Sequence, residues 1–337
     1  MTVIYGIDAG STHTRICVEA PGVPVFRWQV GSINPAAVGA ATAVDRLHET
    51  FRVVADAAAG RPSLGWLASA SIVADTAPEE LAVMRALLPP GSTLLAVSND
   101  AVPMLFAPPL ADCGAVVLAG TGSAFIGCDG TTVVQLGSYE YLGSDQGSGF
   151  DIGLHGLRAA LRARDGIGPP SALPESLSRH VGRDLASEAR HLAAVPFPKQ
   201  AVARLAPVVI QCWLGGDVVA GGVVTAAVES LAAGVAQVRR QLQLAAASGT
   251  VLAGGLVTGC AEFASFLRAA IERACGRHPL TVCTDPAATV LSCARRLAET
   301  GKGRAIGRAY LDRHVWLARP AGVGHESGDI VGYEASQ

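Results

Sequence analysis

The sequence is poor in charge and in aromatic side chains, which narrows the range of its partners. Of its 337 residues only 16% are charged and 5% aromatic, and 26 Lys and Arg against 28 Asp and Glu give a net charge of −2. Because no strong basic block occurs, a nucleic-acid partner is not expected. The eight cysteines contain no C-x-x-C pair, so we expect reduced thiols in a cytosolic protein, without disulfides or a zinc site.

Signals for export and for membrane insertion are weak. The N-terminus begins with an apolar, strand-like segment rather than with the basic segment and hydrophobic run of a secretory signal. The most apolar long window, 206–228, contains Gln211, Asp217 and two Gly pairs, so it falls short of a convincing membrane span. We therefore expect a cytoplasmic protein that has no membrane partner.

Several common catalytic fingerprints are missing from the sequence. No G-x-x-x-x-G-K-[ST] motif occurs, which argues against a P-loop nucleotide site. Gly120 and Gly122 do not extend to G-x-G-x-x-G, because Phe125 occupies the third glycine position, and this disfavours a Rossmann dinucleotide site. H-E-x-x-H and G-x-S-x-G are also missing. What the chain has instead is a set of Gly, Ser and Thr turns, each placed where an apolar segment ends.

The first half of the chain predicts a mixed sheet with helices on its faces. Segments 2–8, 14–19 and 24–30 are typical of three antiparallel strands, and the first turn holds Asp8 beside small residues with free backbone N–H groups. Such a turn suits a phosphate chain and Mg²⁺, although an ordinary Gly/Ser hairpin has the same composition. The order β-β-β-α-β-α-β is completed by a helix at 36–59, a strand at 64–70, a helix at 78–88 and a strand at 93–97.

The second half repeats this unit. An apolar strand at 115–118 runs into the Gly/Thr/Ser turn 120–123, and two more strands follow, separated by a D-G hairpin turn. The repetition predicts two similar domains that face one another, with a ligand in the cleft between their turns. The Gly-rich segment 143–149 precedes a helix and suits an anion or a hydroxyl group. The remaining predicted elements are a mostly helical region at about 165–248, strands at 250–253 and 280–283, and helices at 150–164, 261–275 and 286–300.

Prolines at 103, 108 and 109 mark the expected domain boundary. We expect an N-terminal domain at 1–108 and a second domain at 109–300 that contains the helical region as an insertion. The final helix, 286–300, is either part of the second domain or packs back on the first. Residues 301–337 form a C-terminal tail without clear periodicity.

Six short segments of the sequence together resemble one known family. They are D-A-G-S-T-H-T-R at 8–15, G-S-I-N-P at 31–35, N-D at 99–100, G-T-G-S at 120–123, G-S-D-Q-G-S-G at 143–149 and A-G-G at 253–255. In this order and spacing they resemble the BadF/BadG/BcrA/BcrD ATPase family of the sugar kinase/Hsp70/actin superfamily, which includes N-acetylglucosamine and glucosamine kinases. The resemblance covers about residues 1–300. It implies an α/β fold of two ribonuclease H-like (actin-like ATPase) domains, each with a mixed five-stranded sheet flanked by helices, and an active site in the interdomain cleft.

The resemblance also implies ATP and Mg²⁺ as cofactors and assigns roles to residues. Asp100 would be the catalytic base, with a helix N-cap as its alternative role, and Asp8 would hold the metal. Gln146 stands where the family usually has Glu, which affects substrate preference more than ATP use. The phosphate contacts would be Gly10, Ser11, Thr12, Thr14, Gly120, Thr121, Gly122 and Ser123, the adenosine contacts Gly254 and Gly255, and the sugar contacts Asn34, Asn99, Asp100, Asp145 and Gln146.

The function that this resemblance implies is an ATP-dependent amino-sugar kinase acting on the 6-hydroxyl of N-acetylglucosamine or glucosamine. N-acetylmuramic acid and N-acetylmannosamine are further candidates of the same class, and a homodimer is implied by the same kinases. One alternative is an ATPase activator of an iron–sulfur electron-transfer system, although the cysteines show no cluster motif. Another is a non-catalytic nucleotide- or sugar-binding regulator, although no helix-turn-helix pattern precedes the first strand.

Overall fold

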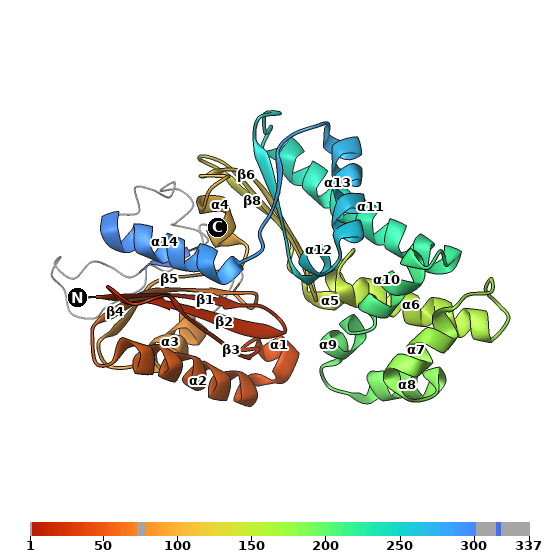
Figure 1. The fold of residues 1–337 in the computed structure, drawn as a ribbon, viewed down its shortest axis with the longest axis horizontal. Coiled ribbons are helices and arrows are strands. Elements are labelled where there is room, and N and C mark those ends of the chain that lie inside the picture. The colour runs from red at the N-terminus through yellow and green to blue at the C-terminus, as the bar shows by residue number, and fades with distance from the viewer. Residues whose placement is uncertain (1, 73–77, 301–314, 318–337) are drawn as a thin grey trace. The chain divides into compact units, whose positions relative to one another are not determined.

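The computed structural model describes residues 2–72, 78–300 and 315–317 (Figure 1). The chain divides into two compact units. The first comprises Met1–Gly114, Cys128–Val133 and Asp285–Gln337, and the second comprises Ala115–Gly127 and Val134–Thr284. Each unit is built on one sheet, so the prediction of two mixed sheets flanked by helices is confirmed.

The sheet of the first unit has the strand order β11-β5-β4-β1-β2-β3. β1 pairs in parallel with β4 and β4 with β5, whereas β1–β2, β2–β3 and β5–β11 are antiparallel. Five of these strands were predicted, but β11 lies in the expected tail and adds a sixth. The strands are β1 (Val3–Ala9), β2 (His13–Glu19), β3 (Phe26–Gly31), β4 (Ser63–Ser69), β5 (Ser92–Ser98) and β11 (Val315–Leu317).

Strand β1 is buried on both sides because two helices cover the two faces of this sheet. Alternate residues of a strand point to opposite faces, and Tyr5 and Ile7 pack in one core cluster with Phe51 of α2 (Ala40–Ala58). On the other face Gly6 lies against the backbone of Leu291 in α14 (Pro286–Thr300), so a larger side chain would not fit there. Figure 1 shows α2 and α14 on opposite sides of the sheet. The shorter helices of this unit are α1 (Pro35–Val38), α3 (Pro78–Ala86) and α4 (Val102–Phe106).

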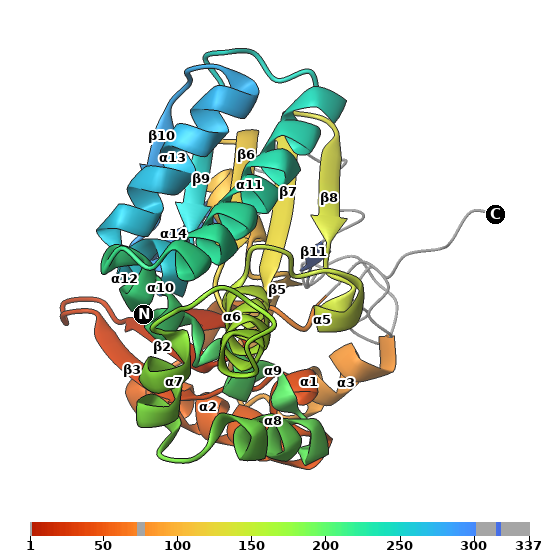
Figure 2. The ribbon, with the colours of Figure 1, turned by 90° about the vertical axis from the view of Figure 1, so that its right-hand side faces the viewer.

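The sheet of the second unit has the order β10-β9-β6-β7-β8. β9 and β10 are parallel, and the three-residue connections from β6 to β7 and from β7 to β8 are long enough only for antiparallel neighbours. Figure 2 shows α11 (Val218–Gln241) and α13 (Ala261–Cys275) crossing one face of this sheet. The strands are β6 (Cys113–Ala119), β7 (Ser123–Asp129), β8 (Val133–Gly137), β9 (Gly249–Ala253) and β10 (Leu280–Val282).

Helices fill the region in which the sequence predicts them. They form one core with the sheet, in which Val117 and Leu252 of the strands pack with Val224 of α11 and Phe263 of α13. Among the described residues, α11 is long and apolar enough to cross a membrane by length and composition, but core helices of soluble proteins also meet that test. The other helices are α5 (Glu140–Gly143), α6 (Gly149–Arg164), α7 (Leu173–Val181), α8 (Leu185–Ala194), α9 (Pro198–Ala203), α10 (Ala206–Leu214) and α12 (Gly255–Gly259).

Candidate functional site

The predicted catalytic segments of the first unit lie at one edge of its sheet. The register places Asp8 beside Ala68 and Ala68 beside Ser98 on the parallel strands β1, β4 and β5. Parallel strands end at a common edge, and ligands of α/β sheets bind outside such carboxyl ends. The turn after β1 and the Asn99–Asp100 pair after β5 therefore share this edge.

A buried serine joins the first phosphate turn to the predicted sugar loop. The backbone N–H of Gly10 donates to the His13 carbonyl at 3.0 Å and closes the turn. The hydroxyl of Ser32, which is fully buried, donates to the Gly10 carbonyl at 3.1 Å and accepts from the Asn34 N–H at 3.1 Å. Arg46 of α2 donates to the Ser32 carbonyl at 3.1 Å. The turn and the loop are thus one hydrogen-bonded assembly supported by α2.

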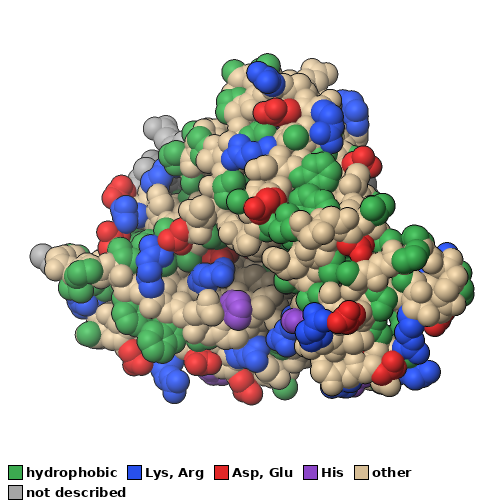
Figure 3. Space-filling model, turned by 45° about the vertical axis from the view of Figure 1, so that its right-hand side comes forward, with side chains coloured by type: hydrophobic (Ala, Val, Ile, Leu, Met, Phe, Trp, Pro, Cys, Tyr) green, Lys and Arg blue, Asp and Glu red, His purple; other side chains and the backbone are tan. Residues whose placement is uncertain are grey.

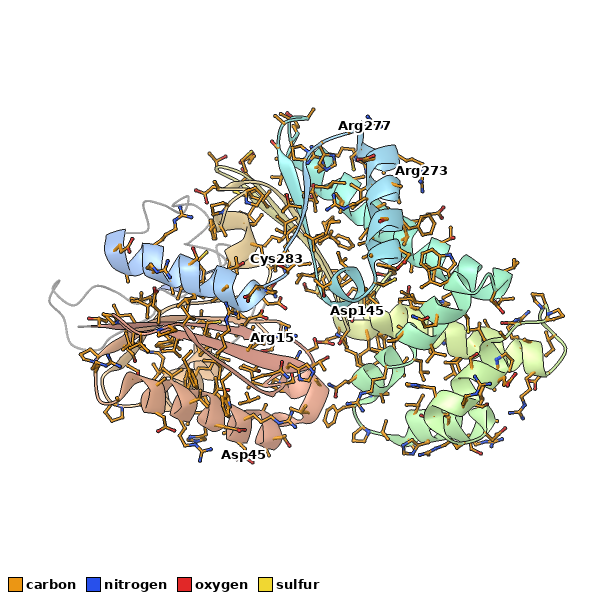
Figure 4. All side chains as sticks on the ribbon, in the orientation of Figure 1. Arg15, Asp45, Asp145, Arg273, Arg277 and Cys283 are labelled. Carbon is orange, nitrogen blue, oxygen red and sulfur yellow. The ribbon has the colours of Figure 1, made fainter. Side chains whose placement is uncertain are left out.

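Asp8 is a buried carboxyl with an altered acidity. Burial raises its pKa from the ordinary 3.8 to about 6, although the guanidinium of Arg15, 3.7 Å from Oδ2, opposes the shift and Asp285 adds to it. Figure 4 labels Arg15, which pairs with Asp8 across β1 and β2. A buried carboxyl group is costly to ionise, and a bound Mg²⁺ would stabilise its ionised form. Proteins often hold Mg²⁺ through one or two carboxylates, waters and substrate phosphates.

The three hydroxyl residues of the first turn have different environments. Ser11 and Thr12 are half-buried at the tip. Thr14 is fully enclosed, and its hydroxyl has no hydrogen-bond partner among the described residues. The turn therefore keeps Ser11 and Thr12 accessible to a ligand, whereas the predicted phosphate contact Thr14 lies inside the unit.

Both asparagines predicted to bind sugar also hold backbone. Asn34 caps α1, its Oδ1 accepting from the Ala36 N–H at 2.9 Å. Asn99 donates through Nδ2 to the Ile72 carbonyl at 3.0 Å and accepts through Oδ1 from the Ala101 N–H at 3.1 Å. The polar atoms of Asn99 are thus committed to fixing the chain on either side of Asp100.

Asp100 follows β5 in the turn that leads to α4, and its side chain is half-buried. The N-cap residue of α4 is Ala101, with no side-chain cap. Asp100 therefore lies one position before the assigned N-cap residue. The carboxylate lies at the edge that also carries Asp8.

In the second unit the turn 120–123 is bonded to the start of α6. The Gly120 N–H donates to the Gly122 carbonyl at 3.0 Å, and the Gly120 carbonyl accepts from the Gly149 N–H at 2.7 Å. The Phe150 N–H donates to the Thr121 carbonyl at 3.0 Å. The N–H groups of Gly149 and Phe150 at the start of α6 therefore already donate to the turn. Fewer N–H groups remain here to bind an anion than the sequence predicts.

Asp145 holds the same turn from the other side. Its Oδ1 accepts from the Ser123 N–H at 2.8 Å, and the Ser123 hydroxyl donates to the Gln146 carbonyl at 2.9 Å. A Cβ at Gly122 would lie 2.6 Å from Oδ1, so a larger residue there would have to displace the Asp145 carboxylate. Asp145 is 4% exposed, whereas the side chain of Gln146 is exposed. Figure 4 labels Asp145, the predicted sugar contact.

Two residues of this region were not predicted from the sequence. The Lys199 ammonium lies 2.8 Å from Asp145 Oδ2 and 2.8 Å from Glu140 Oε2. Composition offers one signal for Lys199: the chain has two lysines, at 199 and 302, and uses Arg for all its other basic side chains. Glu140 has no comparable signal, because its partner lies 59 positions away in the chain.

The predicted adenosine motif lies beside this turn. Gly254 follows β9 with a φ of 102°, and a Cβ there would meet the carbonyl of Ala119 at the end of β6, so only glycine fits. A Cβ at Gly120 would lie 3.9 Å from the Gly255 nitrogen and 4.0 Å from the Gly254 Cα. The structure therefore brings 120–123, 145–146 and 254–255 together at one edge of the second sheet.

Charge outside these turns is dispersed. On the face shown in Figure 3, Lys and Arg side chains alternate with Asp and Glu side chains. The described residues contain no group of three or more His, Cys, Asp and Glu side chains that could hold a metal by themselves. A metal at Asp8 would consequently take its other ligands from water and from a bound phosphate chain.

Comparison with known proteins identifies the family. The family model of the BadF/BadG/BcrA/BcrD ATPase family matches residues 5–291. A glucosamine kinase, GspK of Vibrio cholerae, is 28% identical over 196 residues, which are 56% of this chain and 64% of that kinase. The match thus spans less than two thirds of the relative.

Solved structures share the fold at low sequence identity. A candidate N-acetylglucosamine kinase from Chromobacterium violaceum has a TM-score of 0.66 and 21% identity, over 86% of this chain and 98% of that chain. A ROK family glucokinase from Streptomyces griseus, in complex with glucose and AMPPNP, has a TM-score of 0.52 and 16% identity, over 88% and 99%. The two sheets and these likenesses show the fold of actin-like sugar kinases, and the matching family model shows that the chain belongs to the BadF/BadG/BcrA/BcrD ATPase family.

Proposed function

We propose that this protein is an ATP-dependent amino-sugar kinase that transfers the γ-phosphate of ATP to the 6-hydroxyl of N-acetylglucosamine or glucosamine. The observation that carries the proposal is the common sheet edge in the first unit, where Asp8 and the Gly-rich turn at the end of β1 and Asp100 after β5 lie on either side of the end of β4. Phosphoryl transfer requires a phosphate cradle, charge neutralisation and a group that accepts the proton of the acceptor hydroxyl. This edge offers candidates for all three.

The proposal gives each of the two Gly-rich turns a phosphate-binding role. In the first, the candidate donors are the backbone and hydroxyl groups of Ser11 and Thr12, because the Gly10 N–H already closes the turn. In the second, they are the backbone groups of Thr121 and Gly122, because the N–H groups of Gly120 and Ser123 already donate within the protein. Gly254 and Gly255, beside the second turn, would allow adenosine to approach closely. Asp8 would hold Mg²⁺, directly or through water, and the bound cation would neutralise phosphate charge.

Asp100 is the proposed base for the sugar hydroxyl. Its half-buried position leaves the carboxylate accessible, and the two backbone bonds of Asn99 fix the chain beside it. Such fixation favours catalysis because a base acts only within hydrogen-bond reach of the hydroxyl. Asn34 would contribute its amide nitrogen to the sugar while its oxygen caps α1.

The acceptor is proposed to be a small amino sugar. Its support is the named activity of the Vibrio cholerae relative. N-acetylmannosamine and N-acetylmuramic acid are the alternatives within the same class. We further propose that the protein acts in the cytoplasm as a homodimer.

A substrate panel tests this function. Purified protein with MgATP should release ADP when given N-acetylglucosamine or glucosamine, and Asp100→Asn should abolish this release. The matched control is Asp45→Asn, because Asp45 is an exposed acid on α2, away from the sheet edge (Figure 4). If no amino sugar on the panel stimulates ADP release, the kinase assignment is wrong.

A further inference from the structure

Lys199 is an unusual side chain in this protein. It is one of two lysines in the sequence and is 6% exposed, whereas lysine is almost never fully buried unless it is paired. It lies near the start of α9, a short helix of the second unit. The side chain here is a compact ammonium, whereas nearly all Lys and Arg positions of the chain carry a guanidinium group, and the two are not interchangeable in geometry.

Helix packing holds Lys199 in place. α9 lies directly on α6, where Gly153 contacts the backbone of Val202 and Gly149 approaches the Ala203 side chain at 3.6 Å from its ideal Cβ. The same end of α6 donates its first N–H groups to the turn 120–123. The helix that carries Lys199 is therefore packed against the helix that supports the proposed phosphate turn.

The ammonium connects to that turn through one carboxylate. Lys199 Nζ lies 2.8 Å from Asp145 Oδ2, and Asp145 Oδ1 accepts from the Ser123 N–H at 2.8 Å. Asp145 has a φ of 70°, a conformation that a non-glycine residue adopts at some cost unless its surroundings fix it. Oδ1 thus accepts a hydrogen bond, whereas Oδ2 has no hydrogen-bond partner among the described residues and faces Lys199 as an ion pair. Rotation of the carboxylate would break one of these two contacts.

We propose that Lys199 is a positioning residue of the nucleotide site: its ammonium fixes Asp145, and Asp145 fixes the turn 120–123 in the conformation that binds phosphate. The inference rests on the proposed function in so far as this turn binds nucleotide. It also changes the role of Asp145, which becomes chiefly an anchor of the phosphate turn rather than a sugar contact.

Electrostatics agrees with this arrangement. Burial alone would lower the pKa of Lys199, but the negative charges of Asp145 and Glu140 and the hydrogen bond to Glu140 outweigh that effect, so the net direction is upward and the ammonium stays charged. Without that cation Asp145 would be a buried carboxylate with no ion-pair partner in the described part of the chain. For this reason, removing one partner of a buried ion pair lowers the stability of the folded protein.

Equilibrium binding of MgAMPPNP, measured by calorimetry, tests the inference without requiring turnover. Lys199→Met should weaken binding by about tenfold, within the range of coupling seen between contacting residues. Glu140→Gln is the matched control, since Glu140 binds the same ammonium, is about half-exposed, and does not contact the turn. It should leave the affinity within about twofold.

A double-mutant cycle shows whether Lys199 acts through Asp145. If it does, Lys199→Met combined with Asp145→Asn should bind MgAMPPNP no more weakly than Asp145→Asn alone. The double variant also removes both charges of the pair, so it supplies the comparison if Lys199→Met alone fails to fold. In the steady state, the KM for ATP should rise while the KM for the sugar stays within about twofold.

The outcomes separate this inference from the kinase assignment. If MgAMPPNP binds in a Lys199-dependent manner but no sugar is phosphorylated, the inference stands and the kinase proposal fails. If Lys199→Met lowers the melting temperature but not nucleotide affinity, or if its effect multiplies with that of Asp145→Asn, Lys199 is not a positioning residue. A selective rise in the KM for the sugar, or a wild-type protein that binds no MgAMPPNP, overturns the inference as well.

Discussion

Replacing Asp8 by Asn should stabilise the metal-free protein while abolishing its activity. The pKa of this carboxyl rises from 3.8 to about 6, chiefly because the group is buried. That is a shift of about two units, and each unit corresponds to about 1.4 kcal/mol. Ionised Asp8 therefore lowers the free energy of unfolding by about 3 kcal/mol, and an amide that stays neutral at this position avoids the cost.

The pH dependence follows from the direction of this shift. In the folded state Asp8 holds its proton more tightly than in the unfolded chain, so the free energy of unfolding falls as the pH rises between about 4 and about 6. Above about pH 7 the whole loss is present. The advantage of Asp8→Asn should thus be about 1–3 kcal/mol near pH 8, allowing for imperfect hydrogen bonding of the amide, and about half of that near pH 5.

Urea unfolding of both proteins in EDTA measures this difference. Tryptophan fluorescence is a suitable probe of the first unit, because Trp66 is fully buried there and donates to the Ser98 hydroxyl at 2.8 Å. Added Mg²⁺ with ATP should stabilise the wild type and not the variant. A variant that is less stable than the wild type near pH 8, or whose advantage is the same near pH 5, would refute the account of Asp8 as a buried, metal-seeking carboxyl.

Three further substitutions test other parts of the site. Asp100→Asn should lower kcat by about 10²–10⁴-fold with unchanged stability, as expected for loss of a general base and measured by coupled ADP release. Ser32→Ala should lower the free energy of unfolding in urea by about 1 kcal/mol, because the hydroxyl joins the phosphate turn to the sugar loop. For the same reason it should raise the KM for ATP and the KM for sugar together, and a change in only one of them would contradict this. Gly122→Ala should weaken MgAMPPNP binding by about tenfold or more, because the added Cβ would clash with Asp145. The control is Gly222→Ala in α11, where a Cβ meets nothing within 4 Å, and it should leave the affinity unchanged. Equal losses of affinity in the two variants would contradict this prediction.

Much of the fold could be predicted because its signals are local. Apolar strands that end in Gly, Ser and Thr turns occur twice in the sequence, and both sheets carry these turns at strand ends. β11 has three residues, too few to show a period of two, and it is a strand only because the edge of β5 accepts it. Such a strand depends on a partner far away in the sequence.

The candidate site was predictable in its turns and less so in its side chains. Glycine and hydroxyl residues identify a phosphate turn by local conformation, so Gly10, Gly120 and Gly254 could be named. The partners that fix these turns are distant: Ser32 reaches Gly10 across 22 positions, and Lys199 reaches Glu140 across 59. The periodicity of the sequence contains no information about such distant contacts. The hydrogen bond from Asn99 to the Ile72 carbonyl in another loop is a further example.

The product of the reaction tests the central claim most directly. Purified protein is incubated with MgATP and N-acetylglucosamine or glucosamine, and the sugar product is identified by phosphorus–proton correlation NMR with Asp100→Asn as the negative control. The proposed function predicts a sugar phosphate whose phosphorus couples to the two protons on carbon 6, absent with Asp100→Asn. A phosphate on another hydroxyl, or ATP hydrolysis without any phosphorylated amino sugar, would contradict it.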